Sequence, residues 1–77
     1  MSYEAHAISY VECPRWRAQE IKQKLYDVAQ ATNTVYTTLE ETKGLIRMTI
    51  RFRFDGSVAN LDLVKIQLLQ INAQENV

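Results

Sequence analysis

The sequence predicts a small α+β domain in which strands and helices follow one another in the order β-α-β-β-α. Apolar and polar side chains alternate from Leu45 to Phe54, which is typical of a strand with one buried face. Apolar residues recur at helical spacing between Arg15 and Ala31, and 47% of the 77 residues are hydrophobic, as in ordinary globular domains. We expect residues 1–77 to form one domain, with an antiparallel sheet and both helices on one of its faces.

The first strand is predicted over residues 3–11, because Ile8, Tyr10 and Val11 favour extended structure and no helical period is present. Side chains alternate between the two faces of a strand, and the pattern leaves open which face is buried. One candidate core set is His6, Ile8 and Tyr10, and the other is Ala5, Ala7, Ser9 and Val11.

The first helix is predicted to begin at Cys13–Pro14, because proline is tolerated in the first turn of a helix. No residue from Arg15 to Ala31 would break it. Thr32 and Asn33 are expected to end the helix. Its apolar stripe, which repeats at spacings of three and four, consists of Ala18, Ile21, Leu25 and Val28.

A hairpin is predicted after this helix. Residues Thr34 to Leu39 are rich in β-branched and aromatic side chains, and the polar turn Glu40 to Gly44 leads into the strand Leu45 to Phe54. Strands joined by so short a connection are usually antiparallel neighbours, and the first strand would lie beside the longer one. The longer strand would turn five side chains to the core: Ile46, Met48, Ile50, Phe52 and Phe54.

Residues 58–73 predict a second helix, capped by Ser57 or Asn60, because helix-favouring side chains dominate and no glycine or proline intervenes. The alternative is a fifth element in strand conformation, which would give the order β-α-β-β-β. As a helix, the segment is apolar on two sides and would need a partner subunit to cover one of them. The two stripes are Leu61, Val64, Leu68 and Ile71, and Leu63, Ile66, Leu69 and Ala73.

The residue inventory offers no catalytic, metal or cofactor motif. Cys13 is the only cysteine and His6 the only histidine, so neither an intrachain disulfide nor a zinc ligand set is available. The two glycines, Gly44 and Gly56, lie in predicted turns and make no phosphate-binding loop. We therefore expect a protein that is not an enzyme and that holds no metal or cofactor.

The charge and hydropathy patterns restrict the location and partners of the protein. Nine basic residues balance nine acidic ones, which argues against a chain whose main task is to wrap nucleic acid. Neither a signal sequence nor a membrane-spanning run of apolar residues is present. We expect a cytoplasmic protein that makes no use of a membrane, because a single thiol fits a reducing compartment.

Exposed arginine and aromatic side chains are the candidate binding residues. Arg47, Arg51 and Arg53 would form a row on the outer face of the sheet, joined by Tyr36 if its strand turns that side chain the same way. The other candidates, Trp16 and Arg17, combine an indole with a guanidinium as interface hot spots often do.

The sequence therefore favours a small accessory or regulatory protein that binds another macromolecule, with a protein as the partner, and that forms a homo-oligomer, most simply a homodimer. One alternative is nucleic-acid binding by the arginine face. A weaker alternative is thiol or sulfur-transfer chemistry at Cys13, whose thiol pKa the start of a helix would lower.

Overall fold

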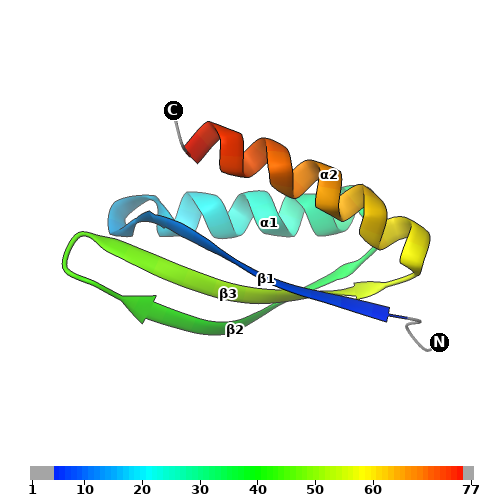
Figure 1. Ribbon diagram of the computed structural model, residues 1–77, viewed down its shortest axis with the longest axis horizontal. Helices are drawn as coiled ribbons and strands as arrows, with labels where there is room; N and C mark the ends of the chain where they lie inside the picture. Colours follow the sequence, from blue (N-terminus) through cyan, green and yellow to red (C-terminus); the bar gives the residue numbers. More distant parts are fainter. Residues whose placement is uncertain (1–4, 76–77) are drawn as a thin grey trace.

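The computed structural model describes residues 5–75, with side chains as far as residue 71, and it confirms the predicted α+β fold and its β-α-β-β-α order. Two helices lie on the same side of a three-stranded sheet (Figure 1). The elements are β1 (Ala5–Pro14), a short 3₁₀ turn η1 (Arg15–Arg17), α1 (Ala18–Thr32), β2 (Val35–Lys43), β3 (Arg47–Gly56) and α2 (Val58–Glu75).

The sheet has the strand order β1-β3-β2, and both pairings are antiparallel. The predicted hairpin is thus β2–β3, and β1 lies along the other side of the long strand, as expected. Because β3 is the central strand, β1 and β2 each keep one edge without a neighbouring strand from within residues 5–75.

The core lies between the sheet and the helices. Every second side chain of β3 is buried there, from Met48 to Phe54, and the residues between them face the open side of the sheet. On β1 the buried side chains are Val11 and Cys13, so the set that begins with Ala5 faces the helices. His6, Ile8 and Tyr10 therefore share the open face with the arginines of β3.

The predicted start of the first helix at Cys13–Pro14 is wrong. Both residues belong to β1, where Cys13 lies opposite Met48 and is buried, and Pro14 has an extended backbone with φ −59° and ψ 144°. Burial of the Cys13 side chain against β3 keeps the strand extended past residue 11, and an edge strand tolerates the missing N–H of proline. The helical turns begin only at Arg15. The part of the predicted first strand at residues 3 and 4 lies outside the described residues.

The predicted turn from Glu40 to Gly44 is also wrong, because β2 continues as far as Lys43. A shift of register between Thr38 and Glu40 leaves Leu39 as an extra residue, which is a β-bulge. The connection is instead residues 44–46, and β3 begins at Arg47 rather than at residue 45. Charged side chains fit this part of β2 because the strand is an edge of the sheet.

The ends of both helices carry the expected signals. Asn33 adopts the left-handed conformation that ends many helices, with φ 56°, and the N–H of Thr34 donates to the carbonyl of Ala29 at 3.0 Å. Before α2, the N–H of Asn60 donates to the hydroxyl of Ser57 at 3.1 Å, so Ser57 is the cap. Helix α2 confirms the helical prediction for residues 58–73, and the strand alternative is wrong. No helix within residues 5–75 is long and apolar enough to cross a membrane.

Candidate functional site

The predicted arginine row lies on the open face of the sheet, on its central strand. The register of the sheet places Tyr10 of β1 and Glu40 of β2 on either side of Arg51. It likewise places Ile8 of β1 beside Arg53. Arg51 and Arg53 therefore lie beside aromatic, aliphatic, hydroxyl and acidic side chains rather than beside further cations.

Carboxylates interleave with the arginines on this face. The Nε of Arg53 donates to Oδ2 of Asp55 at 3.0 Å, and Glu40 lies directly opposite Arg51. Glu12 on β1 lies opposite Thr49, two residue pairs beyond Arg51 and therefore on the same face. The open face thus carries mixed charge, which suits a protein surface better than it suits a phosphate backbone.

Tyr36 does not share the arginine face. It pairs with Phe54 in the sheet, and its ring contacts the rings of Phe52 and Phe54 at centroid distances of 6.0 and 5.6 Å on the side that the helices cover. Its hydroxyl is hydrogen-bonded to that of Thr38 at 2.7 Å. The aromatic side chain of the open face is instead Tyr10, which the sequence placed in one of two possible sets and did not assign to binding.

Trp16 lies in a groove at the hairpin end of the molecule, between η1 and the β2–β3 connection. The N–H of Arg15 donates to the carbonyl of Ile46 at 2.9 Å and holds the two segments together. The groove has a volume of about 570 Å³. We call it the hairpin-end groove, and its walls include Arg15, Trp16, Lys22, Lys43, Leu45 and Ile46.

The apolar walls of this groove are unusually exposed. Trp16 retains 74% of its surface in water and Leu45 retains 91%, although both side chains are large. Trp16, Leu45 and Ile46 thus lie on the surface and contribute little to the core of their own chain. Such a cluster is typical of a protein-binding site.

The polar walls of the groove carry an excess of positive charge. Glu41 is its one acidic wall residue among those that the structure describes, and its Oε1 lies 3.0 Å from Nζ of Lys22. Arg15 and Lys43 make no ion pair with any residue in the described part of the chain. The groove therefore combines apolar contact area with cations that can pair with an incoming carboxylate.

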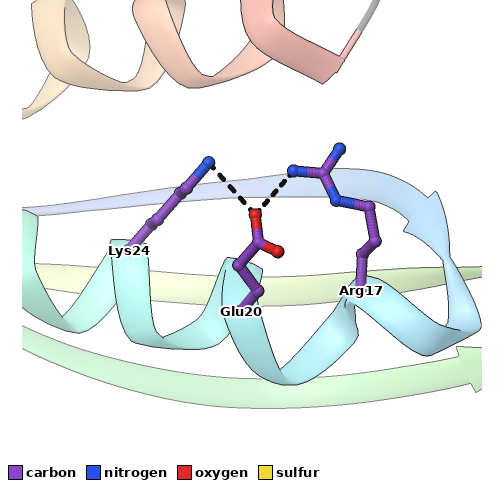
Figure 2. Close-up of polar contacts among 3 residues, drawn as sticks. All are labelled: Arg17, Glu20 and Lys24. Atoms are coloured by element: carbon purple, nitrogen blue, oxygen red, sulfur yellow. Dashed lines mark hydrogen bonds and ion pairs between the residues drawn. The ribbon is translucent and has the colours of Figure 1, made fainter.

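Arg17 belongs to a different surface from Trp16. Its Nη2 donates to Oε2 of Glu20 at 2.6 Å, and Nζ of Lys24 lies 3.4 Å from the same oxygen. Figure 2 shows Arg17, the last residue of η1, and Lys24 of α1 reaching toward Glu20, which lies between them. The Arg17 guanidinium, followed by the Lys24 ammonium, holds the pKa of the Glu20 carboxyl below its usual value. Arg17 thus stabilises the surface of α1 and does not complete the groove.

The structure removes the basis for chemistry at Cys13. The thiol lies in β1 rather than at the start of a helix, and its side chain has no exposed surface. A nucleophilic thiol needs access to its reaction partner. Within residues 5–75, no group of three or more histidine, cysteine, aspartate or glutamate residues could hold a metal ion.

These features define a two-layer α+β protein with an open sheet face of mixed charge and an apolar, basic groove at one end of its hairpin. Comparisons with protein-family models, with curated proteins and with solved structures found no match. The chemistry of these surfaces is therefore the basis on which we propose a function.

Proposed function

We propose that the protein is a small, non-enzymatic accessory or regulatory protein that acts by binding another protein through the hairpin-end groove. The observation that carries this proposal is the exposure of Trp16 beside Leu45 and Ile46 in a groove with two cations that have no carboxylate partner within the described residues. Exposure of a large aromatic side chain to water is unfavourable, and its burial in an interface lowers the free energy.

The chemistry of the groove specifies the kind of partner. A peptide segment with one or two apolar side chains would pack on Trp16 and Leu45, and flanking carboxylates would pair with Arg15 and Lys43. Arg47 lies at the same end of the sheet, next to Lys43 and Gly44, and extends the basic rim onto the open face. We therefore infer an acidic, partly apolar segment as the ligand.

Nucleic-acid binding on the open face is the second candidate. The observation that favours it is Tyr10 beside Arg51, since an exposed ring next to a guanidinium can stack on a base. Glu12, Glu40 and Asp55 on the same face oppose a polyanion. Binding to a protein is therefore preferred to binding to nucleic acid.

We propose the cytoplasm as the location of the protein, because a reducing compartment suits a chain with one cysteine.

The test is a selection of displayed random peptides on the wild-type protein and, in parallel, on Trp16→Ala. Because Trp16 is exposed, its truncation leaves the core intact and should change the unfolding free energy little. The expected result is enrichment of peptides that combine acidic and apolar residues, with binding lost in Trp16→Ala and weakened in Lys43→Ala. Tyr26→Ala, an exposed aromatic on α1, is the matched control and should bind the same peptides.

Peptides that bind wild type and Trp16→Ala equally would contradict the proposal that the groove is the binding site.

The nucleic-acid candidate is tested with the same protein, using labelled single-stranded and duplex DNA at low and moderate salt. Salt-sensitive DNA binding that is lost in a variant with Arg47, Arg51 and Arg53 all changed to alanine would move that candidate to first place.

A further inference from the structure

Helix α2 carries apolar side chains on two sides, and the fold covers only one of them. Leu61, Val64 and Ile71 are buried against the rest of the molecule. Leu63, Ile66 and Leu69, three residues apart and so on one face of the helix, retain 51%, 55% and 70% of their surface. The side chain of Ala73, the fourth member of that stripe, lies outside the described residues. A row of large aliphatic side chains remains in water.

A hollow in the surface also lies next to this row. A hollow of about 330 Å³ separates β1 from α2, with Leu68 and Leu69 on one wall and Ala7 and Ser9 on the other. The helix-facing residues of this half of β1 are small, and none of them is fully buried. Its lining is mostly apolar, with Ser9 and Lys65 as the polar members, so it offers a place in which side chains of another molecule can pack.

The two edges of the sheet differ in how well they are protected. The β2 edge carries the bulge at Leu39 and the charges of Glu40, Glu41 and Lys43, features that block the pairing of strands between molecules. From Ala5 to Val11, β1 is regular and has His6 as its one basic side chain and no acidic one. The unprotected edge therefore lies on the same side as the hollow, with the exposed row of α2 on the adjacent helix.

We propose that a second copy of this chain covers this side, with β1 pairing antiparallel to β1 of the second copy and α2 packing on α2. One interface would then pair the free edge of β1, fill the hollow and bury the exposed aliphatic row of α2. This inference goes beyond the proposed function, because it uses neither the hairpin-end groove nor its ligand. The resulting assembly is a two-fold dimer with one continuous sheet.

The pattern of β1 selects a register for this pairing. Directly opposite residues of two antiparallel strands point to the same face, so a two-fold axis must pass through a residue facing its own copy. An axis at Ser9 pairs Ile8 with Tyr10 of the second copy and His6 with Glu12 of the second copy. Apolar then meets apolar, and the basic side chain meets the acidic one.

Axes at the neighbouring residues fit less well. An axis at Tyr10 would set Ile8 against Glu12, and an axis at Ile8 would set His6 against Tyr10 and leave Glu12 without a basic neighbour. With the axis at Ser9, the two hairpin-end grooves lie at opposite ends of the dimer, because antiparallel pairing reverses the direction of the second copy. Both grooves stay open, and the dimer would be bivalent.

The first test measures mass in solution by sedimentation for wild type, Ile66→Lys and Tyr26→Lys. Ile66 and Tyr26 are exposed to 55% and 51%, so both substitutions should leave the fold intact, as circular dichroism would verify. We expect twice the chain mass of 8.9 kDa for wild type and for Tyr26→Lys, and a single chain for Ile66→Lys. A monomeric wild type, or a dimer that survives Ile66→Lys, would overturn the proposal.

The second test measures the register by oxidative cross-linking. Opposite Cα atoms in an antiparallel pair are about 4.5–5.5 Å apart, within the range that a disulfide spans. Ser9→Cys should therefore form a covalent dimer, whereas Ala7→Cys, more than about 13 Å from its copy, should not. Wild type controls for the buried Cys13. Equal cross-linking of the two variants would overturn the axis at Ser9.

Peptide binding to the groove is measured on Ile66→Lys as well. Because the groove is built within one chain, a monomeric variant should still bind the selected peptides. A failure of the dimer would leave that binding unchanged, and a failure of the proposed function would leave the mass unchanged. The two proposals can thus be rejected separately.

Discussion

The two helices have nearly the same surroundings but differ in how they satisfy their own sequences. In α1 the apolar side chains form one stripe, and Ile21, Leu25 and Val28 are all buried against the sheet and α2. In α2 a second stripe, which includes Ile66, faces away from the sheet and stays exposed. The folded chain thus buries the apolar side chains of α1 but leaves one apolar stripe of α2 exposed. This exposed stripe is the reason for proposing that a second copy of the chain covers α2.

The largest expected difference between the helices is in the stability lost when one leucine of each is truncated. Leu25→Ala should lower the free energy of unfolding by about 2–5 kcal/mol, because Leu25 is fully buried and its loss leaves a cavity. Leu69→Ala should change the stability of the separated chain by less than about 0.5 kcal/mol. Urea denaturation at low protein concentration measures both. A similar loss in the two variants would show that the α2 stripe is part of the core.

A smaller effect is expected at the start of α2, where the helix depends on a local signal. Ser57→Ala removes the hydroxyl that accepts a hydrogen bond from the N–H of Asn60 and should cost about 1 kcal/mol in unfolding free energy. Ser57→Asp keeps an acceptor and adds negative charge at the helix N-terminus, so it should retain wild-type stability. Thermal unfolding separates the variants, and equal stability of all three proteins would refute the capping role.

The smallest effect concerns the polar side of α1, where ion pairs take the place of the exposed leucines of α2. The pKa of Glu20 is lowered in the folded state, so its stabilising contribution is complete above the ordinary carboxyl pKa and is lost as pH falls through the lowered value. The contribution is small because the carboxyl is exposed.

The partners of Glu20 can be ranked by an NMR titration of its carboxyl. Arg17→Ala should raise the Glu20 pKa more than Lys24→Ala, since the Arg17 nitrogen lies at 2.6 Å from Oε2 and the Lys24 nitrogen at 3.4 Å. The reverse order would show that the solution conformation of these side chains differs from that in Figure 2.

Patterns with a clear period predicted most of the fold. The alternation from Met48 to Phe54 in β3 and the stripe of α1 depend on burial that repeats along an element, and both were correct from sequence. The prediction that Ile46 also faces the core is wrong, because Ile46 lies in the connection before β3 and is 59% exposed. The predicted element boundaries were wrong where a tertiary contact outweighed a local sequence signal. Pro14 indicates the start of a helix locally, but Cys13 buries against Met48 and extends the strand past it. Glu40 and Glu41 indicate a turn, but an edge strand accepts them.

The candidate site was only partly predictable because faces depend on register. Nothing in the sequence fixes whether Tyr36 or Thr37 turns toward β3 arginines, and the sheet pairs Thr37 with Arg53 and turns Tyr36 to the core. Trp16 was identified from its chemistry alone. The groove around it was not predicted, because Leu45 and Ile46 belong to the β2–β3 connection, far from Trp16 in sequence, and meet η1 only in the folded chain.

In the proposed dimer, a second copy covers the β1 edge and the exposed row of α2 and leaves the β2 edge open. The most direct measurement is amide hydrogen exchange by NMR on wild type at low and at high protein concentration. We expect that the N–H groups of β1 that point away from β3 become protected as the protein concentration rises, whereas those at the outer edge of β2 exchange at an unchanged rate. Rapid exchange along the β1 edge at every concentration, or protection gained along β2 instead, would contradict it.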